Sequence, residues 1–246
     1  MTPGAPVYWY DELDSTSEEA RRRAKSGELG PLWIAARQQT AGRGRLGRTW
    51  ISPIGNLFTT ALFVEPAGLE QAVRIPFAAG LAVIDVCKQV LPNVDFKLKW
   101  PNDVRVDQSK LCGILIESGE ASGAVWIAAG FGLNVQYAPE GTGQSTSSLN
   151  TLGAPAGLTA DHMLDALRTT FAVRRRQAQT DFPHLLHDWQ AVAEGLGQTI
   201  SAGPPNARIE GVFEGLAEDG GLILRLPDGQ TRTIRAGDVE LVRRVD

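Results

Sequence analysis

Cysteine and histidine are scarce in this 246-residue sequence, which holds two cysteines and three histidines. Cys87 and Cys112 form no Cys-x-x-Cys pair and have no histidine beside them, which argues against a zinc site or a disulfide framework. We expect both to be reduced residues of the core. His184 and His187 share a predicted helix with Asp188 but lack a third strong ligand, so no metal-binding residue is predicted.

Long apolar runs and a basic leader segment are also missing. The apolar stretches are interrupted by charge, proline or glycine well before the ~20 residues that a membrane-spanning helix needs. The first fifteen residues contain no basic segment followed by an apolar run. We therefore expect a cytoplasmic protein without a membrane partner.

An excess of positive charge is absent too. The chain has 24 basic and 28 acidic residues, a formal net charge of −4, so no global positive field attracts nucleic acid. Residues 37–50 are the exception, because Arg37, Arg43, Arg45 and Arg48 occur there without an acidic residue. Any anion site must therefore be local.

The composition that remains is globular, with 43% hydrophobic residues. Capping residues and periodicity predict one helix that begins at 14–19 and three further helices at 69–90, 159–179 and 182–194. Strands are predicted at 31–38, 56–65, 96–100, 110–118 and 123–135. Residues 137–157, rich in Gly, Ser, Thr and Pro, predict a loop. From Gly197 onward, short alternating runs predict four or five antiparallel strands of a small barrel. We place one domain at 1–196 and the second at 197–246.

The stretch AGRGRLGRTW at 41–50 matches the glycine spacing of a dinucleotide fingerprint and nearly that of a P-loop. Both motifs need a helix directly after the glycines to hold phosphates. Pro53 and Gly55 exclude a helix there. The stretch is single and lies between two predicted strands, which predicts a tethered, mobile loop whose arginines close over a phosphate or carboxylate. A solvated surface loop is the alternative that these residues leave open.

Two further clusters point to the same chemistry. Lys110 opens a buried strand, where a lysine costs desolvation unless an anion pairs with it; a lysine that extends to solvent is the alternative. The glycines of Gly130-Phe131-Gly132-Leu133-Asn134 allow a ligand to approach the backbone closely.

Five blocks together carry a resemblance to a known family. They are Asp14-Ser15-Thr16, Gln39 to Arg48 with Trp50, Lys99-Trp100-Pro101-Asn102-Asp103, Lys110 to Glu117, and Gly130 to Val135. In this order they resemble the signature blocks of biotin protein ligases. Ser17, Leu46 and Cys112 depart from the usual residues, which affects details of the pocket and of the loop charge. The chain begins almost directly at the catalytic segment, so we expect no DNA binding.

The resemblance implies an α+β fold: a mixed β-sheet with helices, of the class II synthetase-like biotin/lipoate ligase type, and a small C-terminal SH3-like β-barrel. It implies two reactions. Biotin and ATP give biotinyl-5′-adenylate, and a lysine of a biotin carboxyl carrier protein, a subunit of acetyl-CoA carboxylase, then takes the biotin. Because two anions must meet, such a site needs fixed cations and Mg²⁺ more than a nucleophile.

Residue roles follow from the same resemblance. Ser15, Thr16 and Gln39 bind the ureido ring, Gly113 forms the apolar wall, and Lys110 bridges the biotin carboxylate and the α-phosphate. The loop that closes over the ligands comprises Gly42, Arg43, Gly44 and Arg45, with Arg48 at the outer phosphates and Trp50 on adenine. Asn102 and Asp103 lie on the nucleotide and acceptor side, Asp103 orients the incoming lysine, and Asn134 contacts adenine. Lys110, Arg45 and Asp103 are the predicted catalytic residues.

Two other functions remain open from the sequence. A lipoate or octanoate ligase or transferase shares the architecture, and a non-catalytic nucleic-acid module would use the arginine loop and the small barrel. The choice between a monomer and a homodimer is also open.

Overall fold

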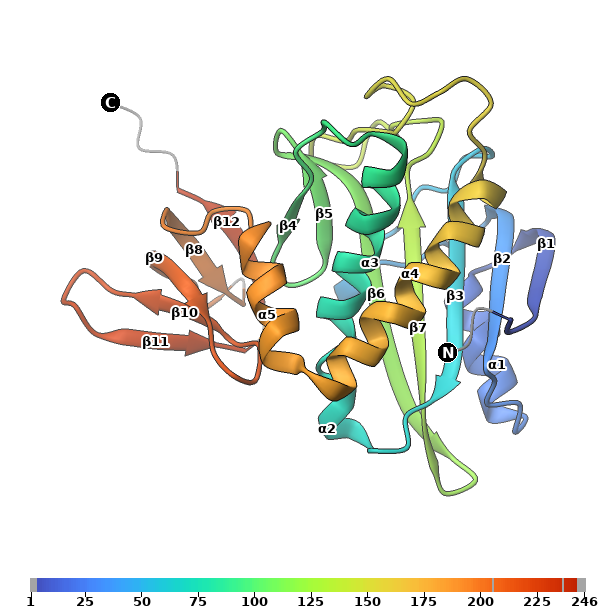
Figure 1. Cartoon of the computed structure of the whole chain (residues 1–246), viewed down its shortest axis with the longest axis horizontal. Coiled ribbons are helices and arrows are strands. Elements are labelled where there is room, and N and C mark those ends of the chain that lie inside the picture. Colours follow the sequence, from blue (N-terminus) through green and yellow to red (C-terminus); the bar gives the residue numbers. More distant parts are fainter. Residues whose placement is uncertain (1–3, 205, 236, 243–246) are drawn as a thin grey trace.

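The computed structural model describes residues 4–204, 206–235 and 237–242, and contains two β-sheets with helices packed between and around them (Figure 1). The larger sheet has seven strands in the spatial order β1 (Val7–Leu13), β2 (Leu32–Gln39), β3 (Leu57–Val64), β7 (Ala124–Leu133), β6 (Ser109–Ala121), β5 (Asp103–Val106) and β4 (Lys97–Lys99). β1 runs parallel to β2, and every other neighbouring pair is antiparallel. The sheet is therefore mixed, as predicted.

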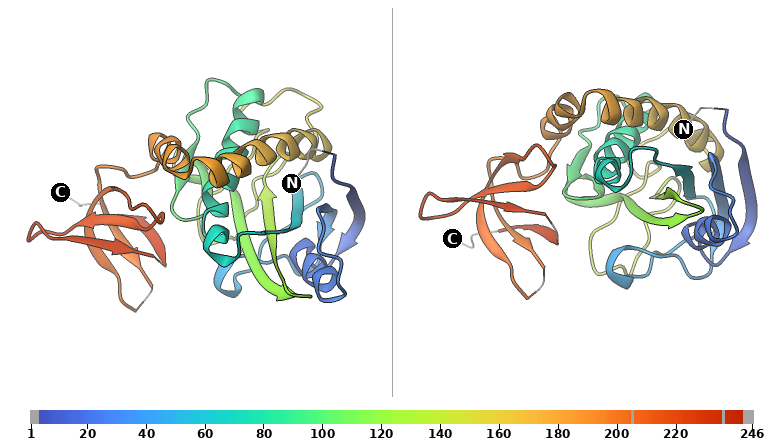
Figure 2. Two further views of the ribbon diagram at one scale, coloured as in Figure 1. Left: turned by 60° about the horizontal axis from the view of Figure 1, so that its bottom comes forward. Right: turned by 90° about the horizontal axis from the view of Figure 1, so that it is seen from below.

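Helices cover both faces of this sheet (Figure 2). On one face lie α3 (Ile75–Val90), α4 (Ala160–Thr180) and α5 (Phe182–Ala191), and on the other lies α1 (Thr16–Lys25). The alternation of β2 explains this arrangement, because Trp33 packs in the cluster with α3 and α4 while Ile34 packs in the cluster with α1. A strand buried on both faces reads as a continuous apolar run.

Three expectations differ from the structure in detail. The helix expected at 69–90 is divided into α2 (Leu69–Ala72) and α3, and Pro76 lies in the first turn of the second helix, where its missing N–H is tolerated. Strands β1 and β5 were not among the predicted strands. β5 has only four residues, and β1 contains alternating polar residues that carry little apolar signal.

The smaller sheet is antiparallel and has five strands in the order β11 (Thr231–Ile234), β10 (Leu222–Arg225), β9 (Ile209–Leu216), β8 (Thr199–Gly203) and β12 (Asp238–Leu241). Within the described residues no pairing joins β11 to β12, so hydrogen bonds do not close this sheet. The indole N–H of Trp100 donates to the Gly220 carbonyl at 3.2 Å, and the Leu216 N–H donates to Gln190 at 2.9 Å. These contacts hold the small sheet against the β4–β5 edge and α5.

Among the described residues, none of the helices combines the length and the apolar character needed to cross a bilayer.

Candidate active site

The floor of the site is a bare patch of the large sheet. Gly113 lies directly opposite Gly132 in the β6–β7 ladder, and Leu115 lies opposite Gly130. Positions two residues apart share a face, so the three glycines lie on the face that also carries α1. Because they lack side chains, a ligand or a ring can approach the backbone there.

The Trp50 indole lies on this floor. A Cβ atom at Gly132 would lie 2.5 Å from the Trp50 ring, and one at Gly113 would lie 2.7 Å from it. The Lys110 ammonium is 5.2 Å from the ring centroid, within range of a cation–π contact. Gly113 and Gly132 therefore need to be glycines because the Trp50 ring occupies the space that a side chain would take.

The arginine loop at 41–50 is a small hairpin over the floor. The Trp50 N–H donates to the Gly42 carbonyl at 2.8 Å, and the Gly44 N–H donates to the Arg48 carbonyl at 2.7 Å. Its tip is a single 3₁₀ turn, Arg45–Gly47, in which Leu46 has φ 56° and is 70% exposed. No helix follows the glycines, since residues 51–56 contain none. The structure therefore confirms that the loop lacks the part that dinucleotide and P-loop motifs require.

A cavity of about 730 Å³ lies between the glycine floor, the arginine loop, the 137–149 loop and β12. Thirteen of the predicted site residues line it: Ser15, Thr16, Gln39, Arg43, Gly44, Arg45, Arg48, Trp50, Asn102, Asp103, Lys110, Gly113 and Asn134. The lining has six cationic residues (Arg43, Arg45, Arg48, Lys99, Arg105, Lys110) and three acidic ones (Asp103, Asp238, Glu240), a surplus of three positive charges. An acidic protein therefore carries a locally cationic cavity, which suits an anionic ligand.

One end of the cavity is a neutral hydrogen-bond network. Gln39 Oε1 accepts from the backbone N–H of Thr16 at 2.8 Å and lies 3.2 Å from its hydroxyl. The Thr60 hydroxyl donates to Thr16 Oγ1 at 2.9 Å, and Gln39 Nε2 donates to the Ser52 hydroxyl at 3.0 Å. Such donors and acceptors without charge suit a polar, uncharged ring.

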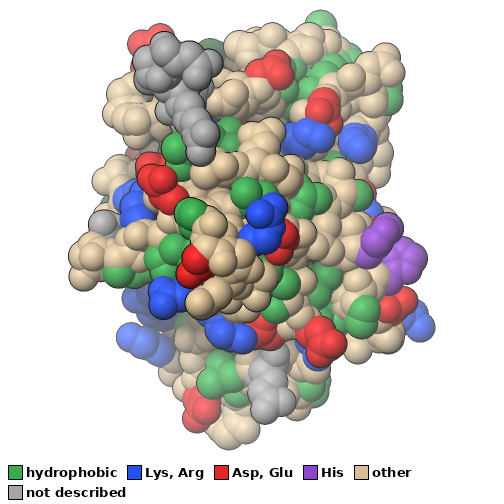
Figure 3. Space-filling view, turned by 90° about the vertical axis from the view of Figure 1, so that its left-hand side faces the viewer, with side chains coloured by type: hydrophobic (Ala, Val, Ile, Leu, Met, Phe, Trp, Pro, Cys, Tyr) green, Lys and Arg blue, Asp and Glu red, His purple; other side chains and the backbone are tan. Residues whose placement is uncertain are grey.

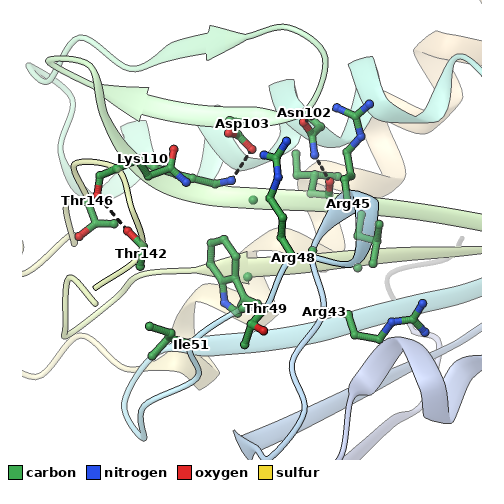
Figure 4. A pocket seen from close by; sticks show the side chains of 18 of the residues that line it. Arg43, Arg45, Arg48, Thr49, Ile51, Asn102, Asp103, Lys110, Thr142 and Thr146 are labelled. Carbon is green, nitrogen blue, oxygen red and sulfur yellow. Dashed lines mark hydrogen bonds and ion pairs between the residues drawn. The ribbon is translucent and has the colours of Figure 1, made fainter. Parts of the chain in front are cut away.

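The opposite end is charged. Lys110 Nζ lies 2.7 Å from Asp103 Oδ1, and the two side chains are only 12% and 15% exposed. Arg45 reaches Asn102 Oδ1 at 3.2 Å, while Asn102 Nδ2 donates to the Ile114 carbonyl at 2.6 Å. Figure 4 shows Lys110, Arg45 and Arg48 directed to this end of the cavity. The three come from two elements that are far apart in the sequence.

Arg43 differs from the other arginines of the loop. Its guanidinium pairs with Glu18 of α1 and lies 3.8 Å from Glu117 of β6. Figure 4 shows it directed away from Lys110. Gly42 is absent from the lining residues, and a Cβ there would lie 2.4 Å from the Trp50 carbonyl. Both residues therefore fix the shape and attachment of the arginine loop.

Asn134 is buried, and its amide is already occupied by protein groups. Its Nδ2 donates to the Ser147 carbonyl at 2.9 Å. Asn56 acts beside it, because its Oδ1 accepts from three successive backbone N–H groups, those of residues 135–137, each at 3.0 Å. These two amides anchor the 137–149 loop, which is the simplest reason for an asparagine at each position.

Cys112 does not narrow the cavity. It alternates with Gly113 on β6 and packs in the core with Cys87 on the face opposite the glycine floor. Burial raises the pKa of the Cys112 thiol well above its ordinary value, so it is a poor nucleophile. Both cysteines are free and buried, as predicted.

Thr60, Lys99 and Asp238 contribute to the geometry and charge of the site but were not among the predicted site residues. Thr60 is fully buried within an apolar strand, and a hydroxyl in such a run is the signal that could have found it. Lys99 belongs to a quoted motif but was given no role. Asp238 is 193 residues from Arg45 and 190 residues from Arg48 in the sequence. No local sequence pattern could reveal its contact with the arginine loop.

Comparisons with known proteins point to one family. A model of the biotin/lipoate A/B protein ligase family matches residues 13–134, and a model of the biotin protein ligase C-terminal domain matches 195–242. The biotin–[acetyl-CoA-carboxylase] ligase of Paracoccus denitrificans is 37% identical over 235 residues, which cover 92% of this chain and 96% of that protein. The chain belongs to the biotin protein ligase family.

Other relatives support this membership. The biotin–[acetyl-CoA-carboxylase] ligase of Mycobacterium tuberculosis is 31% identical, with 94% of this chain and 87% of that protein covered. The biotin protein ligase of Aquifex aeolicus, solved in complex with biotin and ATP, has a TM-score of 0.81 at 26% identity, with 97% and 99% covered. The ligase of Leishmania major, solved with biotinyl-5-AMP, has a TM-score of 0.65 at 25% identity, with 94% and 99% covered. The match to the biotin/lipoate A/B protein ligase family model spans every predicted site residue, whereas Asp238 lies within the match to the C-terminal domain model.

Proposed function

We propose that this protein activates biotin with ATP to biotinyl-5′-AMP and transfers the biotin to a lysine of a biotin carboxyl carrier protein. The observation that carries the proposal is the polarity of the cavity. A neutral hydrogen-bond network lies on the β2–β3 side of the glycine floor, and Lys110, with Arg45 beside Asn102, lies on the β6–β5 side. A molecule with a polar uncharged ring and a carboxylate fits this order, with the nucleotide phosphates beyond it.

The adenylation chemistry follows from charge. A biotin carboxylate oxygen bonds to the α-phosphorus of ATP while the bond to the β-phosphate oxygen breaks, and pyrophosphate leaves with that electron pair. Lys110, a fixed cation in a half-enclosed site, stabilises the negative charge shared between the two reacting groups. Arg45 and Arg48 hold the phosphates in line. Because the arginine loop covers the cavity, it also shields the adenylate from water.

In the second step an acceptor lysine attacks the activated carbonyl carbon and AMP leaves. We assign Asp103 to orient this lysine, since its carboxylate lines the cavity beside Lys110. The names of the relatives indicate a carrier domain of acetyl-CoA carboxylase as the acceptor.

Mg²⁺ completes the proposed set of cofactors. Within the described residues no group of three or more His, Cys, Asp or Glu side chains forms a metal site. Mg²⁺ is commonly bound by one or two carboxylates together with substrate phosphates. The Asp103 carboxylate, which forms an ion pair with Lys110 and lines the cavity, fits such a role, and the ion would neutralise phosphate charge there.

We further propose the two-domain division at 1–196 and 197–246, with the five-stranded sheet as an SH3-like barrel. The separate family matches at 13–134 and 195–242 support the boundary. The match to the C-terminal domain model of biotin protein ligases supports the barrel, and the positive φ angles of Gly195 and Gly197 mark the junction.

A lipoate or octanoate ligase or transferase is the alternative within the same broader family. Exchange of labelled pyrophosphate into ATP separates these functions when it is measured with biotin, with lipoate and with neither acid. We expect exchange that depends on biotin. Exchange with lipoate alone would refute the proposal, and a Gln39→Ala variant should lose affinity for biotin without losing affinity for ATP.

A nucleic-acid module is the weaker alternative. The face that carries the small sheet intersperses acidic and basic side chains (Figure 3), in place of the continuous basic stripe that nucleic-acid binding needs. The local excess of basic over acidic residues lies instead in the cavity lining, where six cationic residues meet three acidic ones.

A further inference from the structure

Asp238, the first residue of β12, connects the small sheet to the arginine loop. Its Oδ1 lies 3.4 Å from Arg45 Nη1, and its Oδ2 accepts from Arg48 Nη2. The Gly237 carbonyl also accepts from Arg45, at 3.4 Å. One carboxylate therefore engages two of the three arginines in the loop, across the gap between the two sheets.

A third cation is close to the same carboxylate. Lys99, on β4, lines the cavity together with Asp238, and their charges interact. Within residues 4–204, 206–235 and 237–242 the Lys99 ammonium has no carboxylate at ion-pair distance. Burial, with the nearby Arg105 charge, lowers the pKa of Lys99, which indicates a cation that gains from an added anion.

The balance of charge at this point favours an anion other than Asp238. Two guanidinium groups engage this one carboxylate, and over the whole lining six cationic residues meet three acidic ones, a surplus of three positive charges. Although burial disfavours its charged form, the hydrogen bond from Arg48 holds the pKa of Asp238 below its ordinary value, so it is ionised at neutral pH. A diphosphate, which offers more charge and more acceptor oxygens, can replace it on both arginine forks.

We propose that Asp238 is a built-in competitor of the nucleotide phosphates for Arg45 and Arg48, and that Lys99 adds a third cation to the site that the pyrophosphate leaving group occupies. The assignment of the ligand rests on the proposed adenylation function. Pyrophosphate departs when the bond between the α-phosphorus and the β-phosphate oxygen breaks. Asp238 then returns to the two arginines, which keeps the loop paired while the cations are without a phosphate ligand and assists product release.

Direct binding of inorganic pyrophosphate tests the proposal without biotin or turnover. Isothermal titration compares the wild-type protein with Asp238→Asn, which keeps an oxygen acceptor for Arg45 and removes only the charge. Removal of a competing, partly exposed anion should tighten pyrophosphate binding by about three- to tenfold. Asp219→Asn is the matched control, because Asp219 also pairs with an arginine (Arg235, 2.6 Å) on the small sheet but does not line the cavity.

Each outcome decides the question. Weaker binding by Asp238→Asn would overturn the proposal and make Asp238 a supporting or metal-binding residue, especially if the weakening needs Mg²⁺. If Asp219→Asn tightened pyrophosphate binding equally, the change would come only from the net charge of the protein, and the proposal would be wrong. In an Arg48→Gln background the gain from Asp238→Asn should shrink to less than about twofold, because the shared partner is gone.

Failure of the proposed function would look different. If wild-type protein showed no biotin-dependent exchange but Asp238→Asn still tightened pyrophosphate binding, the diphosphate site would stand and the biotin assignment would fall. Thermal unfolding of each variant checks that the small sheet remains folded.

Discussion

Replacement of Lys110 by methionine tests two effects of its ammonium group, namely on the rate of adenylate formation and on the stability of the fold. Lys110 Nζ is 2.7 Å from Asp103 Oδ1, with both side chains no more than 15% exposed. Loss of the ammonium removes a preorganised cation from the reacting groups, which should slow adenylate formation by about 10²–10³-fold, or roughly 2.7–4 kcal/mol. It also leaves Asp103 without its partner, which should cost about 1–3 kcal/mol of unfolding free energy.

Two assays and a double variant divide these effects. Biotin-dependent pyrophosphate exchange reports the rate, and urea denaturation reports the free energy of unfolding. In Lys110→Met/Asp103→Asn no unpaired carboxylate remains, so stability should return toward that of the wild type while exchange stays slow. Lys97→Met is the matched control, because Lys97 pairs with the 77% exposed Asp95 at 3.1 Å outside the cavity. It should change neither measurement appreciably.

Recovery of wild-type exchange in the double variant would refute the argument. Lys110 would then act only by neutralising Asp103, and the cation at the reacting phosphate would have to be sought among the arginines.

Other perturbations test the floor, the acid response and the core. Gly132→Ala forces the Trp50 ring from its seat at a cost of about 1–3 kcal/mol; biotin titration should show weaker binding, and unchanged affinity would contradict the packing. The hydrogen bond from Arg22 lowers the pKa of Asp14 from 3.8 to about 2, so the stabilisation by this carboxylate is present above pH 3.8 and is lost as the pH falls through 2. The difference in Tm between wild type and Asp14→Asn should therefore vanish near pH 2. A difference that grows as the pH falls would show that the Asp14 carboxylate does not stabilise the fold in this way. Arg175→Met leaves the 2% exposed Glu65 carboxylate without its cation, and denaturation should show a loss of about 3–5 kcal/mol, whereas a loss below about 1 kcal/mol would mean that Gln179 suffices.

Local sequence determined most of the elements of this fold. Apolar runs and turn residues placed β2, β3, β6 and β7 to within a few residues, and Thr159 capped α4 as its position predicts, with its hydroxyl accepting from the N–H of His162. Pro53 and Gly55 alone excluded a phosphate-binding helix after the glycines of the arginine loop. These features depend on neighbours in the chain, whose chemistry the sequence displays directly.

The sequence also supplied the candidate site residues, but mainly through resemblance of whole blocks. It could not show that Gly113 and Gly132 face each other in the β6–β7 ladder, or that Trp50 lies across both. Nor could it show that Asn134 is used to hold a loop, since an asparagine at a strand end fits a ligand equally well. Register and packing decided these roles.

Asp238 shows most clearly what the sequence alone could not predict. Nothing near it in the chain distinguishes it from other surface acids of the small sheet, and its carboxylate matters because folding places it among Arg45, Arg48 and Lys99. The sequence by itself determined which segments become strands, helices and loops, and that positive charge gathers at 37–50. Only the tertiary structure decided which charges meet, because Coulomb interactions depend on distance in space and on burial, and neither is written in the order of residues.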